Sequence, residues 1–281
     1  MGHRSVDQRL SIVENYRLMF STDLLSAFKS SLKGYLLQCI NALCLSPADF
    51  DSTELRKAIG GRKMDEDTVL EILCTRSNAQ IHQIKEAYTK QYFGRDLMAD
   101  IKNCSTGHFT ELLLKQCSSE RSESLQVDSD LAKKDAQRLY DVIEKRVANT
   151  GPELNSLLCA RTFLHMRFVF EAFSTLANYE VEDALKKAFN GNLLRSYLYL
   201  VQLIRSKPKY FAERLYQSMK GLGTNDTMLI RIIVTRCELD MGYIKEEFGS
   251  ENKHSLAKWI TDDTTGNYRR LLLALINEDN Q

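Results

Sequence analysis

The stretch of this sequence best suited to chemistry is MKGLGTNDTMLI, at residues 219–230, where two glycines precede a polar cluster and an apolar run. Glycine adopts backbone dihedrals that other residues avoid, so such a loop can turn several carbonyl oxygens toward one point. A Ca²⁺ ion takes about six to eight oxygens, from carbonyls, carboxylates and water. A glycine that ends one helix, followed by Thr or Asn that caps the next, is also what a plain helix-turn-helix needs. Taken alone, the stretch leaves a cation loop and a structural turn both open.

The elements that must position this loop belong to an internal repeat. RSVDQ at residues 4–8 matches RSNAQ at 76–80, and DLLSAFK at 23–29 matches DLMADIK at 96–102, a shift of 72 to 73 residues. Two more segments, at 157–173 and 232–248, follow the same plan: an apolar run that ends in arginine, a polar patch and an amphipathic helix. Four repeats are therefore expected.

Within each repeat the apolar residues have a helical period. Positions 69, 70 and 73 ahead of Arg76 fall on one helical face, and positions 229, 232 and 233 ahead of Arg236 reproduce that face. The chain holds only 3 Pro and 13 Gly, which favours helices over a sandwich of short strands. The expected fold is all-α, with each repeat a small helical bundle.

Breaks between helices are expected where glycine punctuates the pattern. Glycine suits a helix C-terminus, and Ser or Thr can cap the helix that follows. The tetrads LKGY, STGH, NGNL and TTGN place this glycine at Gly34, Gly107, Gly191 and Gly266. The polar segment at residues 118–130 is expected to be an exposed linker.

An arginine closes the apolar run of each repeat. Such a residue is expected to be structural, with its guanidinium satisfying carbonyl groups at helix ends, and a charged channel lining is the alternative. The four arginines are Arg4, Arg76, Arg161 and Arg236.

Composition limits the remaining classes of function. The 38 basic and 37 acidic side chains nearly cancel, so no global field favours nucleic acid or an anionic surface. The seven cysteines form no zinc spacing, and their odd number indicates reduced thiols in a cytosolic setting. No apolar run approaches the roughly 18 to 20 residues that span a bilayer. The sequence carries no phosphate-binding loop, zinc-protease or nucleophile-elbow motif, so we expect no enzyme.

The combination of KGLGTND, then TRCELD, then a TTG tetrad, inside a repeat of about 70 residues, resembles the annexin family. The resemblance runs over almost the whole chain, from Arg4 to Ile276. It implies five helices in each of four repeats that form a curved disc, and calcium-dependent binding of anionic phospholipid through loops on the convex face. Repeat one departs from the pattern because nothing precedes Arg4 that could supply its first two helices. We expect a truncated isoform or fragment, or a face that another surface covers.

The resemblance also implies a ligand set for Ca²⁺. The family pattern uses carbonyls of the residue two before the first glycine and of both glycines, and an acid 40 residues after the second glycine. In repeat four these positions are Met219, Gly221, Gly223 and Asp263. Thr224 and Asp226, at the start of the next helix, are a possible secondary and weaker ion site.

The sister loops lack this set. Repeat two carries Lys63 and Met64 at the second glycine and the threonine, with Cys104 at the acidic position. Repeat three carries Ala148 and Asn149 in its loop and Ala188 at the acid, while repeat one has no first loop and Ser31 at the acid. We therefore expect one intact site, weak by itself at about 10⁻⁴ to 10⁻³ M, that gains ligands from a lipid headgroup.

The expected organisation is a partial repeat one at residues 1–46, repeat two at 47–117, a linker at 118–130, repeat three at 131–206 and repeat four at 207–281. The first expected function is calcium-dependent binding to anionic membranes by a cytoplasmic protein that lies peripherally on them. The alternative is a degenerate repeat scaffold that binds a protein partner or its own copy through the open face of repeat one.

Overall fold

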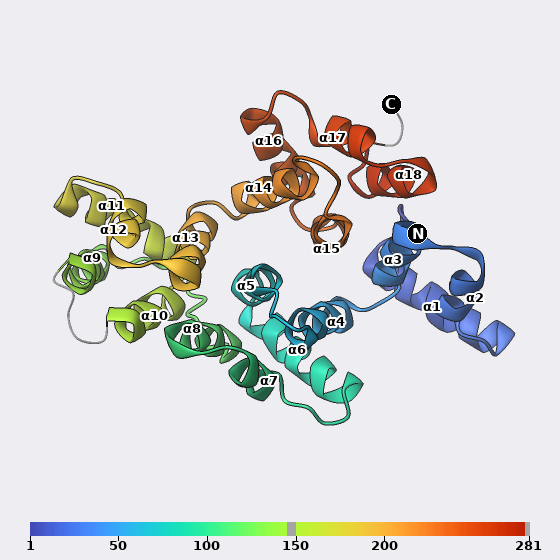
Figure 1. Ribbon diagram of the computed structural model, residues 1–281, viewed down its shortest axis with the longest axis horizontal. Helices are drawn as coiled ribbons and strands as arrows, with labels where there is room; N and C mark the ends of the chain where they lie inside the picture. The colour runs from blue at the N-terminus through green and yellow to red at the C-terminus, as the bar shows by residue number, and fades with distance from the viewer. Residues whose placement is uncertain (145–149, 279–281) are drawn as a thin grey trace. The chain divides into compact units, whose positions relative to one another are not determined.

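The computed structural model describes residues 1–144 and 150–278, and within these ranges the chain forms eighteen α-helices and no strand (Figure 1). The all-α expectation is therefore confirmed. Not one of the described helices has the length and apolar character needed to cross a bilayer.

The chain divides into two compact units. The terminal unit joins residues 1–50 to residues 208–281, and the central unit comprises residues 51–207. The limits expected for the four repeats stay a prediction.

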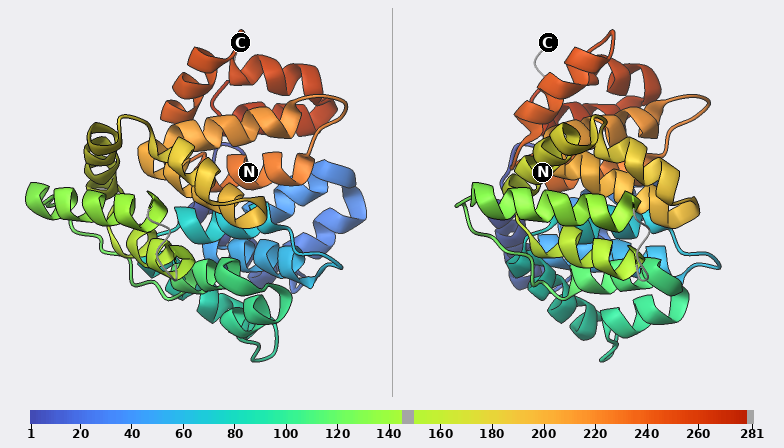
Figure 2. Two further views of the ribbon diagram at one scale, coloured as in Figure 1. Left: turned by 60° about the vertical axis from the view of Figure 1, so that its left-hand side comes forward. Right: turned by 90° about the vertical axis from the view of Figure 1, so that its left-hand side faces the viewer.

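The terminal unit brings the two ends of the sequence together. Helix α3 packs against both α15 and α18, and Figures 1 and 2 show the first helices beside the last ones. Its buried side chains include Cys39 from α3 and Ile232 from α15. The helices are α1 (Val6–Phe20), α2 (Leu24–Ser31), α3 (Gly34–Leu43), α14 (Lys207–Met219), α15 (Asp226–Arg236), α16 (Met241–Glu251), α17 (Leu256–Asp263) and α18 (Gly266–Leu275).

The central unit has a second core of its own. Helix α11 packs along α9, α10 contacts both α8 and α9, and α5 contacts α8 and α13. Leu112 and Phe170 are among its fully buried side chains. The helices are α4 (Pro47–Gly60), α5 (Glu66–Thr75), α6 (Asn78–Gln91), α7 (Leu97–Cys104), α8 (Gly107–Cys117), α9 (Ser129–Glu144), α10 (Thr150–Ala160), α11 (Phe163–Ala177), α12 (Val181–Ala188) and α13 (Gly191–Arg205).

Matching sequence positions make matching helix starts. Ser5 and Ser77 each form a complete capping box with a glutamine three residues later, at the first turns of α1 and α6. Asp23 and Asp96 likewise cap α2 and α7 through their side chains. The helix-capping hydrogen bonds thus recur with the same spacing along the chain as the matching sequence segments.

The role expected for the tetrad glycines is wrong. Each of them opens the next helix instead of ending the previous one, with φ between 59° and 65°. The Thr106 and Thr265 side chains ahead of two of these glycines make no capping hydrogen bond. Glycine is suited here because this left-handed φ strains residues that carry a Cβ. The other two glycines of the set are Gly34 and Gly191.

The partners expected for the structural arginines also need correction. Arg76 donates from Nε and Nη2 to the two carboxylate oxygens of Asp51, at 2.6 and 2.7 Å, with both side chains 4% exposed. Arg161 binds Asp135 and Arg236 binds Asp240 in the same two-pronged way. In these three repeats the guanidinium therefore meets a carboxylate and not helix-end carbonyls, because charge pairing offsets its desolvation.

The polar segment between repeats two and three is non-helical from residue 120 to 128 and mostly exposed, as expected. It is nevertheless anchored to the rest of the central unit. The Ser122 amide donates to the Ala160 carbonyl at 2.9 Å, and Arg121 donates to the Arg161 carbonyl at 2.7 Å.

Candidate metal centre

The glycine loop of repeat four connects α14 to α15. Met219 is the last residue of α14, and Asn225 caps α15 by accepting a hydrogen bond from the Met228 amide at 3.1 Å. The Asn225 amide donates to the Ser218 carbonyl at 2.6 Å, which closes the base of the loop. Residues 220–223 therefore project from a fixed base.

Both glycines of the loop have left-handed backbone. Gly221 has φ 102° and Gly223 has φ 85°, and a Cβ added to either would meet no atom within 4 Å. Their glycine identity is therefore required by conformation and not by space. This backbone satisfies the first requirement for a loop that presents carbonyl oxygens.

The distant acid of the sequence pattern lies beside this loop. Asp263 is the last residue of α17, and the Thr224 hydroxyl donates to its Oδ2 at 2.9 Å across 39 residues of sequence. Asp263 is half-buried, whereas its neighbour Asp262 is exposed and pairs with Lys258 at 2.7 Å. The structure thus brings Thr224 and Asp263 together, at the end of the loop that carries the two glycines.

Met219 and Asp226 flank the loop as buried residues. Met219 is 1% exposed, and its carbonyl is the one oxygen that it has to offer an ion. Burial raises the pKa of Asp226, the hydroxyl of Tyr268 acts against that shift, and the charge of Asp263 adds to it. The two carboxylates are therefore close enough to repel each other, which a bound cation would relieve.

These groups fit a Ca²⁺ ion in their chemistry. The candidate donors are carbonyl and carboxylate oxygens, which are the hard ligands that Ca²⁺ prefers. No group of three or more His, Cys, Asp or Glu side chains that could hold a metal occurs in the described part of the chain. A metal site at this loop would thus depend on backbone oxygens, with Asp263 supplying the charge.

The tip of the loop carries an exposed apolar side chain. Leu222, between the two glycines, is fully exposed at 109% of its reference area. The preceding Lys220 places its ammonium 5.2 Å from the centre of the Tyr216 ring, and that ring lies 5.2 Å from the ring of Trp259. The single tryptophan of the chain is thus linked to the loop by two contacts.

The corresponding loop of repeat two is closed by the same backbone hydrogen bond but carries different side chains. The Asp65 amide donates to the Ala58 carbonyl at 2.9 Å, as Asn225 does to Ser218. Met64 Sδ and Cys104 Sγ lie 3.6 Å apart, at the positions that Thr224 and Asp263 occupy in repeat four. A sulfur pair therefore replaces the hydroxyl–carboxylate pair.

The second turn of this loop also differs. Lys63 stands where repeat four has Gly223, and neither Lys63 nor Gly61 has a positive φ. A Cβ on Gly61 would lie 3.2 Å from the Lys63 carbonyl oxygen, so that oxygen faces back into its own loop. The backbone does not reproduce the conformation of residues 221–223.

The other two repeats have fewer groups that could bind a cation at the matching positions. Ala148 and Asn149 of repeat three lie outside the described residues, and Ala188 ends α12 without an oxygen-bearing side chain. In repeat one, Ser31 ends α2, and its hydroxyl lies 3.4 Å from that of Ser30. The acidic position is thus occupied by Ser, Cys, Ala and Asp in the four repeats, in order.

Reasoning from the sequence did not find the contacts that hold the acid in place. The Thr224–Asp263 hydrogen bond and the proximity of Tyr268 to Asp226 link separate helices, and no local pattern indicates them. One signal in the sequence did indicate that these two positions meet. Where repeat four has the oxygen-bearing Thr224 and Asp263, repeat two has the sulfur-bearing Met64 and Cys104.

The chain is similar to known proteins over almost its whole length. The family model described as Annexin matches residues 50–115 and 210–275. Annexin A7 of Homo sapiens is 38% identical over 278 residues, which cover 99% of this chain and 57% of that protein. Annexin A13 of Canis lupus familiaris is 38% identical over 277 residues, which cover 99% of this chain and 87% of that protein. The chain therefore spans little more than half the length of the first of these relatives.

A solved structure of annexin III superposes with a TM-score of 0.96 at 34% sequence identity. The match covers 99% of this chain and 86% of that one. The fold implied by the resemblance in sequence is thereby confirmed.

Proposed function

Because this chain belongs to the annexin family, we propose that it binds anionic phospholipid membranes in a calcium-dependent way, mainly through the glycine loop of repeat four. The observation that carries this proposal is the hydrogen bond of 2.9 Å between Thr224 and Asp263, which holds a carboxylate beside a loop with two left-handed glycines. The protein is then cytoplasmic and peripheral on the membrane, as a member of this family.

In this proposal the backbone of the loop supplies most of the ligands. The carbonyl oxygens of Met219, Gly221 and Gly223 would hold the ion together with the Asp263 carboxylate. Bound Ca²⁺ supplies a positive charge that one carboxylate leaves only partly neutralised, with coordination positions still open. The open positions accept a phosphate or carboxylate oxygen of a lipid headgroup, so affinity for calcium and for membrane rise together.

Two further residues form a weaker secondary site in this proposal. Asp226 is 8% exposed at the first turn of α15, and the Thr224 hydroxyl already donates to Asp263. Because Asp226 is buried and Thr224 is already hydrogen-bonded, neither side chain can adjust freely to an ion, which supports a secondary role for this site. Leu222, fully exposed at the loop tip, presses into the headgroup region, where its burial adds to the binding free energy.

The loops of repeats one to three are degenerate in this proposal. The sulfur contact between Met64 and Cys104 supports this for repeat two, because neither side chain is a hard oxygen donor. Ala188 and Ser31 support it for repeats three and one, since neither provides a carboxylate.

The test is sedimentation with phosphatidylserine vesicles, in Ca²⁺ or in chelator, for the unaltered chain and for two neighbouring variants. Asp263→Ala should raise the Ca²⁺ concentration for half-maximal pelleting about tenfold, or ~1.4 kcal/mol. Asp262→Ala is the matched control, because that exposed carboxylate pairs with Lys258 and is not part of the proposed ligand set. Equal pelleting in calcium and in chelator would refute the proposal.

A second candidate function rests on an uncovered face of α1. Ile12 is 40% exposed, whereas Ile84 of α6 and Ile244 of α16, at the same position of their repeats, are 1% and 0% exposed. Leu18, Met19 and Phe20 extend this surface at 68%, 74% and 57%. An apolar surface of this kind supports binding of a protein partner or a second copy, with little dependence on calcium.

Light scattering without lipid separates the two candidates. A dimer or larger species that dissociates on Phe20→Glu would support association through α1. A monomer at all concentrations, in a chain that pellets with vesicles only in Ca²⁺, would favour the membrane function over self-association.

A further inference from the structure

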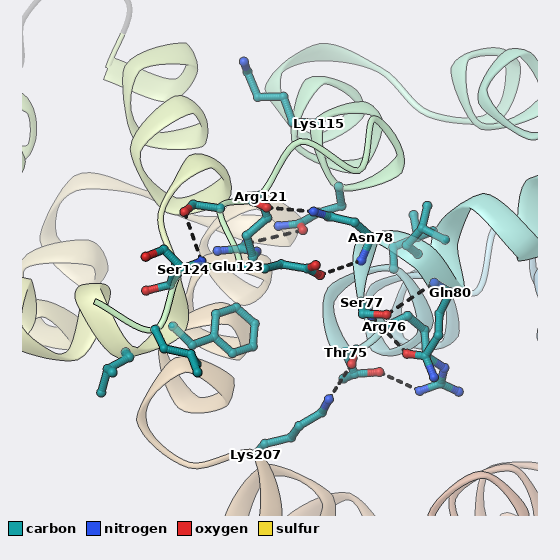
Figure 3. A pocket seen from close by; sticks show the side chains of 18 residues that line it. Thr75, Arg76, Ser77, Asn78, Gln80, Lys115, Arg121, Glu123, Ser124 and Lys207 are labelled. Atoms are coloured by element: carbon teal, nitrogen blue, oxygen red, sulfur yellow. Dashed lines mark hydrogen bonds between the residues drawn. The ribbon is translucent and has the colours of Figure 1, made fainter. Parts of the chain in front are cut away.

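A cavity of about 310 Å³ lies within the central unit, and no residue of the glycine loop lines it (Figure 3). It is lined by the end of α5, the first turns of α6 and α11, the connection before α9, and Lys207. Residues 121–125 of the connection form one wall. These elements belong to one compact unit, so the cavity has a defined shape.

The charge of the lining is predominantly positive. Arg76, Lys115, Arg121 and Lys207 line the cavity, whereas Glu123 is the one acidic residue among the described residues that do so. Arg76 is already neutralised by Asp51. The Lys207 ammonium donates to the Thr75 carbonyl at 2.5 Å.

Among the described residues, Arg121 has only neutral partners. Its Nη1 donates to the Arg161 carbonyl at 2.7 Å, its Nη2 reaches the Gln116 amide oxygen at 3.4 Å, and its guanidinium lies 4.6 Å from the centre of the Phe163 ring. No carboxylate lies within ion-pair distance of it in the described part of the chain, although burial lowers its pKa. A half-buried guanidinium whose hydrogen-bond partners are neutral is incompletely compensated for its desolvation, and an oxyanion would offset that cost.

The N-termini of two helices add to the positive potential in the cavity. Helix α6 begins at Asn78 and α11 at Phe163, and both first turns line the cavity. The Asn78 backbone amide already donates to the Glu123 carboxylate at 3.0 Å, and Figure 3 shows Glu123, Asn78 and Arg121 close together. The protein thus places a carboxylate of its own on one helix start, which is the chemistry that this region favours.

The remaining wall is apolar. Leu73, Ile81, Phe163 and Leu164 contribute side chains to the lining. A ligand that fits both walls needs an oxyanion at one end and a flat apolar body at the other.

We propose that this cavity binds a small organic oxyanion, a carboxylate or a phosphate monoester with an aromatic or similarly flat body. The Arg121 guanidinium binds the oxyanion and the Phe163 side of the cavity receives the body. This site is independent of calcium and of the glycine loop of repeat four.

The test is isothermal titration calorimetry on the full chain in calcium-free buffer with chelator, which keeps it separate from the membrane function. The probes are phenyl phosphate, benzoate and inorganic phosphate. Phenyl phosphate and benzoate should bind saturably with one site per chain, and inorganic phosphate should bind about tenfold more weakly because it leaves the apolar wall unused. No saturable heat with either aromatic probe would overturn the proposal, and equal affinity for inorganic phosphate would overturn the role of the apolar wall.

Variants locate the binding. Arg121→Gln retains a donor for the Arg161 carbonyl and should weaken both aromatic probes about tenfold. Lys90→Gln removes an exposed charge of α6 that does not line the cavity, and it should change nothing. Phe163→Leu should weaken the aromatic probes and leave inorganic phosphate unaffected, which keeps the site testable if Arg121→Gln unfolds. Affinity that is unchanged in both cavity variants would show that the probes bind elsewhere and overturn the assignment.

Discussion

Thr224 and Asp263 are joined by a hydrogen bond of 2.9 Å, and the matching pair of repeat two, Met64 and Cys104, is joined by a sulfur contact of 3.6 Å. The fold therefore brings the same two positions together in both repeats. Their chemistry, and not their proximity, distinguishes a loop that suits Ca²⁺ from one that does not. The first three predictions below depend on this pairing or on the loop beside it.

Thr224→Val removes the hydroxyl that orients the Asp263 carboxylate and keeps the shape of the side chain. Loss of one hydrogen bond of about 1 kcal/mol should raise the Ca²⁺ concentration for half-maximal response about fivefold. The response can be followed by vesicle pelleting and by the fluorescence of Trp259. Thr227→Val, at an exposed position of α15, is the matched control and should leave the midpoint in place. An unchanged midpoint in Thr224→Val would mean that the hydrogen bond does not position the acid.

Gly223→Ala places a Cβ on a residue with φ 85°, so the strain should lower the free energy of unfolding by about 1 to 2 kcal/mol. Calcium-dependent pelleting should weaken as well, since the loop can relieve the strain only by turning its carbonyl. Gly249→Ala in α16 provides the contrast, because that glycine is helical and a Cβ there meets nothing within 4 Å. It should stabilise the chain by about 0.5 to 1 kcal/mol. Urea denaturation measures both, and a loss no larger for Gly223→Ala than for Gly249→Ala would contradict the assignment.

The repeat-four chemistry can be transferred to repeat two. Lys63→Gly, Met64→Thr and Cys104→Asp together supply the second glycine, the hydroxyl and the carboxylate at positions that already meet. In the Asp263→Ala background, this triple variant should restore calcium-dependent pelleting. The variant with Lys63→Gly and Met64→Thr alone should not, because it lacks the carboxylate. Restoration by the double variant would show that the acid is dispensable.

Asp226 makes the free energy of unfolding depend on pH. Its folded-state pKa lies above the ordinary value of 3.8, chiefly because of burial, so the folded chain holds this proton more tightly than the unfolded chain. Ionisation of Asp226 therefore costs stability as the pH rises above 3.8, and the cost is complete once the pH exceeds the raised pKa. Asp226→Asn cannot ionise, so it should be more stable than the unaltered chain at neutral pH, with a difference that shrinks on acidification.

Chemical denaturation at several pH values in calcium-free buffer measures this difference. Asp183→Asn, an exposed carboxylate in α12 paired with Lys186, is a control expected to show no such trend. A gap between Asp226→Asn and the unaltered chain that widens as the pH falls would reverse the sign and contradict the prediction.

The all-α fold and the recurrence of its helices were predictable from the sequence because both depend on local periodicity. The apolar spacing ahead of Arg76 and Arg236 predicts helices, and α5 and α15 carry those faces into the cores. The candidate loop was also recognisable, since two glycines two residues apart permit left-handed backbone, which Gly221 and Gly223 both adopt. Its ligand set came from resemblance to a family, because spacing alone left a plain turn equally open.

Other features needed the tertiary structure. From the sequence, the tetrad glycines were expected to end the preceding helix, whereas they begin the next one. Left-handed φ is equally compatible with a helix end and with this helix start. The carboxylate partner of Arg76 is Asp51, which lies 25 residues earlier on another helix. The pairing of Thr224 with Asp263, and the cavity around Arg121, likewise unite segments about 40 residues apart.

The sequence by itself therefore determined which helices form and where a left-handed loop interrupts them, since these depend on residues within a few positions of one another. The tertiary structure decided which buried charges are paired and which hydroxyl holds the Asp263 carboxylate beside the loop. The physical reason is that a helix hydrogen-bonds within itself, whereas a buried side chain takes its partner from whatever element packs against it.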